Sequence, residues 1–225
     1  VLGNIFSNVH AGEIQGESLG IDVDIFNEKG ESVGANHKGE LVIKNPFPTI
    51  PIKFWNDVNN KKLKKAYFSK YKNIWYHGDF IQKTQNGGFI MLGRSDTTLN
   101  PGGVRMGTAE IYRQVENIEF VRESLVVGQN WKDDVRIILF VVMETKKKLG
   151  VKEINFIKSK IKDNCSPKHV PHKIIEIPEI PRTKSGKIVE LAVKKAIHGK
   201  NIENLESLSN PESIKFFKNL YEKGL

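Results

Sequence analysis

Several features that define other protein classes are scarce or missing in this sequence of 225 residues. It has one cysteine, Cys165, so no disulfide can form within the chain, and its histidines and cysteine show no metal-ligand spacing. Its longest apolar run, residues 137 to 143, is far shorter than the roughly 20 residues that a membrane-spanning helix needs. No charged-then-apolar signal segment opens the chain. We therefore expect no disulfide scaffold, no metal site held by the protein, no membrane association and a reducing, cytoplasmic setting.

Arginine is also scarce, with six residues in the chain, although the formal net charge is +9. The charge is uneven, because residues 1 to 93 carry a balance of +2 and residues 94 to 225 a balance of +7. A lysine-rich, solvated surface explains most of this excess, and the alternative is attraction of a polyanion such as a nucleotide, coenzyme A or nucleic acid. Three of the six arginines, Arg94, Arg105 and Arg182, fall in two glycine-containing loops. Their placement is more informative than the number of lysines.

The first part of the chain shows the patterns of short β-strands. Residues 19 to 26 alternate apolar and polar side chains, as a strand with one buried face does. Turn residues and three prolines separate the apolar segments, and a short helix is expected around residues 61 to 68. Residues 1 to 94 therefore predict a small antiparallel sheet or barrel, with strands at residues 19–26, 39–44, 80–83 and 88–92.

The pattern changes after residue 94. Apolar residues at helical spacing and apolar runs of strand length follow in the order helix, strand, strand, helix, strand, helix, with Thr108 as the expected N-cap of the first helix. This order predicts a compact α+β domain over residues 95 to 200, within the usual range of domain sizes. Residues 201 to 225 predict a tail with a short helix after Asn210-Pro211. The predicted fold class is α+β, a small antiparallel β subdomain followed by a compact α+β domain.

The segment G-R-S-D-T-T-L-N-P-G-G-V-R at residues 93 to 105 has the composition of a phosphate-binding loop. Its Asn100-Pro101-Gly102-Gly103 stretch favours a tight type II turn, and Gly103 leaves the backbone open to a thin ligand. Arg94 is a permanently charged donor suited to phosphate or sugar hydroxyls, and Arg105 lies just before an expected helix start, where anions are favoured. The alternative is a surface hairpin with incidental arginines.

A carboxylate precedes this loop in W-Y-H-G-D at residues 75 to 79. Asp79 has the chemistry to accept hydrogen bonds from two vicinal hydroxyls, as a ribose offers, and the alternative is a turn residue between strands. His77 in the same stretch is interpreted as a packing or turn residue, and His169 as structural. No arrangement of Ser, His and Asp or of Cys and His predicts a catalytic nucleophile.

A second basic loop, P-R-T-K-S-G-K, spans residues 181 to 187. A lysine beside Ser185-Gly186 can place a positive charge on phosphate oxygens as negative charge develops in a transition state. The loop is not a Walker loop, because Gly186-Lys187 is followed by Ile188. The alternative is an ordinary basic turn between a strand and a helix.

Four stretches in order resemble the adenylate-forming acyl-CoA synthetases, and most closely their acetoacetate-activating branch: F-W-N-D at 54–57, K-A-Y-F-S-K at 65–70, L-N-P-G-G-V-R-M-G-T-A-E-I-Y-R-Q-V-E at 99–116 and S-P-K-H-V-P at 166–171. The resemblance covers essentially all 225 residues and implies the C-terminal third of such an enzyme. These enzymes join a carboxylate to the α-phosphate of Mg·ATP, releasing pyrophosphate, and then transfer the acyl group to the thiol of coenzyme A. It therefore implies an ATP-dependent, AMP-forming acid:CoA ligase that uses small-molecule substrates, namely ATP with Mg²⁺, coenzyme A and acetoacetate.

The resemblance also implies roles for individual residues. Lys187 would be the adenylation lysine, which bridges the carboxylate and the α-phosphate, and Asp96 would be the hinge about which residues 95 to 200 rotate as a mobile lid between the half-reactions. The implied ligand-binding residues are Asp79 and Arg94 at the ribose, Arg105 near phosphate, Gly103 at the pantetheine tunnel and, more loosely, Lys162 near coenzyme A. One departure is that Ile188-Val189-Glu190 follows Lys187 where many members carry an arginine.

The chain begins Val1-Leu2-Gly3 without an initiator methionine, and the resemblance implies a longer polypeptide. The phosphate loop, adenine pocket and acid pocket of the family would lie upstream of Val1, so the expected partner is the N-terminal domain of the same polypeptide, and residues 1 to 94 would be the end of that AMP-binding body. We expect the chain alone to be inactive.

Two alternatives remain open. The acid could be acetate, propionate or a longer one, or the chain could be a non-catalytic basic module that binds nucleic acid. The second alternative predicts aromatic residues interleaved with basic ones on a sheet face, and aromatic residues are few after residue 94. Nucleic acid is therefore the less favoured partner.

Overall fold

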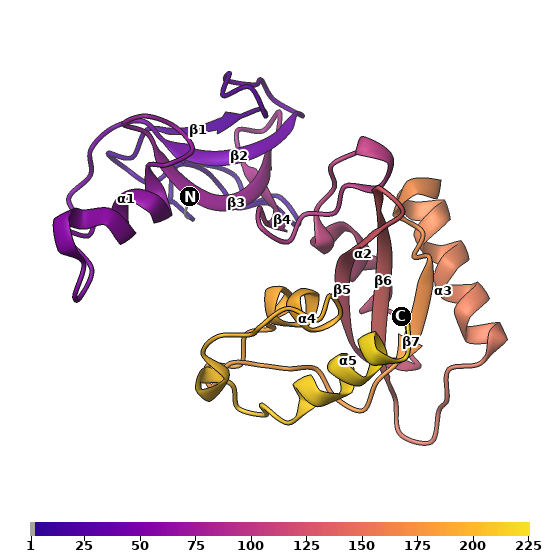
Figure 1. Ribbon diagram of the computed structural model, residues 1–225. Helices are drawn as coiled ribbons and strands as arrows, with labels where there is room; N and C mark the ends of the chain where they lie inside the picture. The colour runs from indigo at the N-terminus through magenta and orange to yellow at the C-terminus, as the bar shows by residue number, and fades with distance from the viewer. Residues whose placement is uncertain (1–2) are drawn as a thin grey trace. The chain divides into compact units, whose positions relative to one another are not determined.

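The computed structural model describes residues 3–225 and divides the chain into two compact units, with the division between Ser95 and Asp96 (Figure 1). We call the part before this division the first unit and residues 96–225 the second unit. None of the helices in residues 3–225 combines the length and the apolar character that crossing a bilayer requires. The predicted α+β fold class is confirmed, since the first unit contains an antiparallel sheet and the second unit mixes a sheet with helices.

The first unit is built on a four-stranded sheet with strand order β1-β2-β3-β4. Every neighbouring pair is antiparallel, as the sequence predicts. The first strand begins at Val23 rather than at residue 19, and the Leu19 side chain before it is 89% exposed instead of packing on the core face. The elements are β1 (Val23–Phe26), β2 (Lys38–Ile43), a short turn of helix (Val58–Asn60), α1 (Lys61–Tyr67), β3 (Trp75–Lys83) and β4 (Phe89–Arg94).

The sheet of the first unit carries two groups of apolar side chains. One face carries a small core of Val23, Ile25, Leu41, Ile81 and Phe89. Aromatic residues also gather around Trp75 at the start of β3, whose ring stacks on that of Tyr67 with 3.7 Å between centroids. These side chains account for the aromatic-rich segment around α1.

The second unit is built on a three-stranded sheet with strand order β5-β6-β7. Strands β5 and β6 form a long antiparallel hairpin, whose two turn residues, Lys132 and Asp133, have φ of 48° and 63°, as a tight hairpin turn requires. Strand β7 is parallel to β6 and is reached through helix α3. The elements are α2 (Thr108–Val115), β5 (Val121–Trp131), β6 (Asp134–Met143), α3 (Val151–Asn164), β7 (Lys173–Glu176), α4 (Glu190–Ala196) and α5 (Ser213–Glu222), with helical turns at Pro101–Gly103, Pro167–His169 and Leu205–Ser207.

Helices cover both faces of this sheet, which explains why β6 is apolar almost throughout. Helices α2 and α3 pack on one face through Ile111, Val115 and Ile157 (Figure 1). Helices α4 and α5 pack on the other face through Val193 and Phe217. The Phe217 ring meets the Phe140 ring of β6 edge to face at 5.0 Å. The sequence predicts a tail with a short helix for residues 201 to 225. In the structure these residues form α5 and contribute part of the core on this face of the sheet.

The start of helix α2 differs by one residue from the sequence prediction. The N-cap is Gly107, and Thr108 is the first helical residue and is buried. The side chain of Glu110 accepts a hydrogen bond of 2.9 Å from the N–H of Gly107, which is one half of a capping box. The cap is therefore supplied by a side chain inside the helix instead of by a threonine before it.

Candidate functional site

Asp79 lies within β3, opposite Arg94 of β4 in the strand register. Its Oδ1 is 3.4 Å from Nη1 of Arg94, and its Oδ2 is 2.6 Å from Nδ1 of His77. The carboxylate is largely buried, whereas the Arg94 side chain is 55% exposed. The structure thus brings together two of the predicted ligand residues and adds a third, His77, which the sequence analysis interprets as a packing or turn residue.

The charge of Asp79 is stabilised by these neighbours. Partial burial by itself would raise the pKa of the carboxyl group, but the hydrogen bond from His77 and the positive charges of His77 and Arg94 outweigh it, so the pKa lies below its ordinary value. The site therefore presents a carboxylate with a guanidinium beside it. This pair can accept hydrogen bonds from hydroxyls and donate to them or to a phosphate.

Gly78 makes room for this arrangement. Its φ is +85°, and a Cβ at this position would lie 2.9 Å from Nη2 of Arg94. The carbonyl oxygen of Gly78 also accepts a hydrogen bond of 3.0 Å from the N–H of Ser95. A larger residue here would displace the guanidinium and strain the backbone at the same time.

Ser95, the last residue of the first unit, is also fixed through its side chain. The hydroxyl of Ser95 donates a hydrogen bond to Glu40 of β2, a carboxylate with no exposed surface. The ammonium group of Lys70 pairs with the other oxygen of Glu40 at 2.6 Å. Asp96, the predicted hinge, follows directly as an exposed residue in a turn and is the first residue of the second unit.

In the second unit, the glycine-rich loop is anchored at its base and exposed at its tip. Leu99 and Met106 are buried and exchange two backbone hydrogen bonds of 2.9 Å across the loop. Gly102 and Gly103 at the tip have φ of +58° and +73°, and the N–H of Val104 donates to the carbonyl of Pro101 at 3.2 Å. The turn therefore has both glycines at its centre, one residue later than the predicted type II turn with Pro101 at its second position. Gly103 is exposed, and no atom lies within 4 Å of where its Cβ would be.

A carboxylate from a neighbouring hairpin fixes the same loop. Both carboxylate oxygens of Asp134 accept a hydrogen bond from the N–H of Gly102, at 2.9 and 3.1 Å. The backbone N–H groups of Val135 and Gly102 lower the pKa of Asp134 below its ordinary value. On the other side of the tip, Nε of Arg105 donates to the hydroxyl of Thr98 at 3.2 Å, so Arg105 is half-buried and held by its own loop.

Lys187 lies on a closed hairpin turn. The N–H of Thr183 donates to the carbonyl of Lys187 at 2.8 Å, the N–H of Lys187 donates to the hydroxyl of Thr183 at 3.1 Å, and Gly186 takes φ of +83° at the bend. An isolated bridge between Arg182 and Ile188 closes its base. The Lys187 side chain is exposed. We call residues 183–187 the lysine hairpin.

Glu190, the last residue of the Ile188-Val189-Glu190 stretch that follows Lys187, has a defined partner. Its carboxylate accepts a hydrogen bond of 2.5 Å from the hydroxyl of Tyr112, which in turn accepts one of 3.0 Å from the N–H of Val126. Burial raises the pKa of the Tyr112 hydroxyl well above its ordinary range, and the charge of Glu190 acts in the same direction. The hydroxyl therefore remains a proton donor and joins α2, the edge strand β5 and α4.

The remaining predicted site residues lie apart from one another within the second unit. Lys162 is exposed on the last turn of α3. The loop with Gly103 and Arg105 leads into α2, on the same face of the sheet as α3, whereas the lysine hairpin leads into α4 on the opposite face. The second unit thus offers a glycine loop from one face and a lysine from the other. Within residues 3–225, no group of three or more His, Cys, Asp or Glu side chains is arranged to hold a metal ion.

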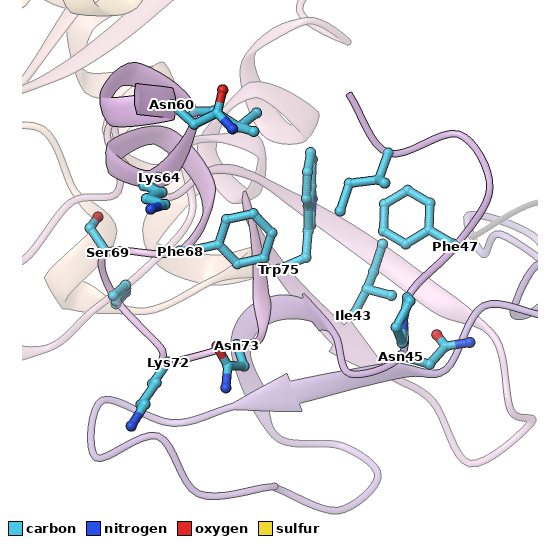
Figure 2. A pocket seen from close by; sticks show the side chains of 14 residues that line it. Ile43, Asn45, Phe47, Asn60, Lys64, Phe68, Ser69, Lys72, Asn73 and Trp75 are labelled. Atoms are coloured by element: carbon cyan, nitrogen blue, oxygen red, sulfur yellow. The ribbon is translucent and has the colours of Figure 1, made fainter. Parts of the chain in front are cut away.

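The first unit also contains a cavity of about 800 Å³ beside α1 (Figure 2). Figure 2 shows Phe68 and Phe47 on either side of Trp75, with Lys64 and Lys72 farther out. The buried indole nitrogen of Trp75 has no hydrogen-bond partner. Asp79 and Arg94 do not line this cavity, so it is separate from the candidate ribose site.

Comparisons with known proteins agree with these motifs over almost the whole chain. No family model matches the sequence. The chain is 51% identical over 222 residues to acetoacetyl-coenzyme A synthetase of Rhizobium meliloti strain 1021, a match that covers 99% of this chain and 34% of that protein. It is 45% identical over 221 residues to acetoacetyl-CoA synthetase of Xenopus tropicalis, which covers 97% of this chain and 33% of that protein. The chain therefore spans about a third of the length of these curated relatives.

Solved structures give the same result for the fold. Acetoacetyl-CoA synthetase from Streptomyces lividans superposes with a TM-score of 0.89 at 38% sequence identity, over 96% of this chain and 33% of that one. A benzoate CoA ligase from Burkholderia xenovorans LB400 superposes with a TM-score of 0.69 at 25% identity, over 83% of this chain and 36% of that one. The resemblance inferred from the four sequence motifs is confirmed.

Proposed function

We propose that this chain, which is similar along almost its entire length to one third of the acetoacetyl-CoA synthetases, carries the ribose site and the mobile lid of an ATP-dependent, AMP-forming acid:CoA ligase that activates acetoacetate. The observation that carries the proposal is the identity of 51% over 222 residues, a match long enough to span the whole segment in which the predicted site residues lie. It supports an enzyme over a basic nucleic-acid-binding module.

The proposed reaction has two steps. In the first, a carboxylate oxygen of acetoacetate attacks the α-phosphorus of ATP, the bond to the β-phosphate oxygen breaks, and pyrophosphate leaves with Mg²⁺ bound to phosphate oxygens. In the second, the thiolate of coenzyme A attacks the acyl carbon, the thioester forms, and AMP leaves with the bonding electron pair. The thiol proton passes to solvent. A cytoplasmic location, where these substrates are available, is part of the proposal.

In the first unit, Asp79 would bind the ribose hydroxyls of ATP, with Arg94 contacting the same sugar. The geometry supports this role, because the carboxylate is held ionised and its guanidinium partner is half-exposed beside it. Gly78 keeps this pair in place. The first unit would then be the end of the nucleotide-binding body, completed by the rest of the polypeptide.

In the second unit, Lys187 would neutralise the negative charge that develops at the α-phosphate during adenylation. Its exposed position on a closed hairpin supports this role. Gly103 would line the passage for pantetheine in the thioester-forming arrangement, with Arg105 near phosphate and Lys162 near coenzyme A. Because Gly103 and Lys187 come from opposite faces of one sheet, rotation of this unit about Asp96 would exchange one for the other.

The test uses the complete polypeptide that contains this chain, with the two steps measured separately. Lys187→Ala should lower acetoacetate-dependent exchange of pyrophosphate into ATP by roughly 100- to 1,000-fold, the scale of losing one preorganised charge at a transition state. Formation of acetoacetyl-CoA from preformed acetoacetyl-adenylate should remain within about threefold of the parent protein. Lys184→Ala, on the same exposed turn, is the matched control and should leave both steps intact.

Equal damage to both steps by Lys187→Ala would remove the proposed role of this lysine. Replacing acetoacetate by acetate or propionate in the exchange assay separates the alternative acids, because the preferred acid gives the highest kcat/KM. A mobility-shift titration with RNA at two salt concentrations addresses the binding-module alternative, which requires tight, salt-dependent binding. We expect this chain on its own to give no turnover.

A further inference from the structure

Arg182 connects the lysine hairpin to the edge of the sheet. Its Nη1 donates to the carbonyl oxygen of Gly186 at 2.8 Å, and its Nη2 pairs with Oε2 of Glu123 at 2.6 Å. Gly186 immediately precedes Lys187. One planar group thus contacts both the bend of the hairpin and strand β5, a two-point geometry that guanidinium provides and ammonium does not.

A β-bulge aims Glu123 at this arginine. The pairing of β5 with β6 shifts between Val121 and Glu123. As a result, Val121 packs in the core with α2 and α3, whereas Leu125 packs in the core with α4 and α5, although the two residues are an even number apart. Glu123 lies two residues before Leu125 and so shares its face, which is the side from which the lysine hairpin emerges.

The backbone of Arg182 is fixed at the same time. Its N–H donates to Oδ1 of Asn210 at 3.0 Å, and its carbonyl oxygen accepts from the N–H of Ser209 at 2.9 Å. The N–H of Lys184 donates to the carbonyl of Ser207 at 3.0 Å. The hairpin therefore has a fixed base along residues 207–210, and the Arg182 guanidinium contacts its bend from outside residues 183–187.

We infer that Arg182, oriented by Glu123, is a positioning residue for Lys187: it holds the carbonyl of Gly186 so that the lysine is presented at one place and angle. This inference rests on the proposed function, since it assigns Arg182 a role through the adenylation lysine. Both side chains of the ion pair are about one-third exposed, so the pair adds little to the stability of the fold. Its main effect is on where Lys187 points.

The experiment compares variants of the complete polypeptide in the two half-reaction assays. Arg182→Met keeps the length of the side chain but removes both contacts, and it should lower kcat for adenylation roughly 10- to 100-fold, as a displacement of about 1 Å of a catalytic group does. KM for ATP and thioester formation from preformed adenylate should stay within about threefold. Arg182→Lys should be intermediate, because an ammonium group has no fork to span both acceptors.

Two further variants make the comparison specific. Glu123→Gln should give a smaller loss confined to adenylation, and it keeps the inference testable if Arg182→Met does not fold. Arg122→Met is the matched control. Nε of Arg122 also lies near Glu123, 3.8 Å from its Oε1, but Arg122 belongs to β5 and does not lead into the lysine hairpin. This variant should behave like the parent protein. In a Lys187→Ala background, Arg182→Met should cause no additional loss of adenylation, because residues acting through one group are not additive.

The outcomes separate this inference from the proposed function. If Lys187→Ala leaves adenylation intact, the proposed function fails. If Lys187→Ala abolishes adenylation while both Arg182→Met and Glu123→Gln leave it intact, the positioning role alone is overturned. Equal loss in both half-reactions, or a further loss in the Lys187→Ala background, would also overturn it, because each result would place the action of Arg182 elsewhere.

Discussion

The hydroxyl of Tyr112 joins α2, β5 and α4 through two hydrogen bonds, and its removal is a sensitive test of the fold of the second unit. Tyr112→Phe keeps the ring and deletes the hydrogen bond to Glu190 at 2.5 Å and the one from Val126 at 3.0 Å. Both former partners lose a contact, and Val126 has no exposed surface. The substitution therefore combines a lost charge-assisted hydrogen bond with a donor left without its acceptor.

The size of the effect follows from these two contacts. A hydrogen bond to a charged group contributes about 1.5–3 kcal/mol, and leaving a buried partner unsatisfied costs about as much again, so with partial rescue by water we expect a destabilisation of about 2–4 kcal/mol. For a unit of this size that corresponds to a fall in Tm of about 10 °C. Opening should also become easier at the amide of Val126, whose hydrogen exchange should accelerate by roughly 30-fold or more.

The measurement is thermal unfolding together with amide hydrogen exchange resolved to β5. Tyr221→Phe, at a tyrosine that is 50% exposed, is the matched control and should change neither. Glu190→Gln keeps an acceptor for the hydroxyl and should cost less than half as much as Tyr112→Phe. Unchanged exchange at Val126 and an unchanged Tm in Tyr112→Phe would refute the reasoning.

Two further predictions concern the candidate ribose site. Gly78→Ala should displace the Arg94 guanidinium and weaken ATP binding several-fold in the complete polypeptide, measured as KM for ATP, because its Cβ would lie 2.9 Å from Nη2 of Arg94. Gly87→Ala is its control, with a similar φ of +82° and open space around the new Cβ, and equal effects of the two would show that backbone strain alone is responsible. Because the pKa of Asp79 is lowered in the folded state, its ionised form stabilises the fold above the ordinary aspartate pKa of about 3.9, and this contribution is lost as pH falls below that value. The difference in unfolding free energy between the parent protein and Asp79→Asn, from denaturant titrations at pH 7 and pH 3, should therefore shrink at the lower pH, and a difference independent of pH would contradict the assignment.

Much of the fold could be predicted because its signals are local. The alternation in residues 19 to 26, the helical spacing of apolar residues in α3 and the apolar run of β6 each depend on neighbours within one element. The turns at residues 27–30 and 84–87 are marked by glycine and asparagine, which accept positive φ, whereas the β5–β6 turn takes positive φ at Lys132 and Asp133, which no such signal marks. These patterns were sufficient to give the order of elements in both units.

Contacts between distant elements could not be predicted in this way. Tyr112 and Glu190 are 78 residues apart, and Arg182 and Glu123 are 59 apart, so no local pattern marks either pair. The bulge that turns Glu123 toward Arg182 follows from strand register, which depends on packing across the whole sheet. The contact of His77 with Asp79 had a local signal, because residues i and i+2 of a strand share a face, but that signal requires knowing that the strand begins at Trp75.

Glu40 has a practical consequence for anyone dividing this gene product into separately expressed halves. Its carboxylate is fully enclosed and counts the Ser95 hydroxyl among its partners. A cloning boundary placed before Ser95 would leave an enclosed anion with fewer donors and would weaken the N-terminal half at its centre. A boundary placed between Ser95 and Asp96 keeps that donor with its acceptor.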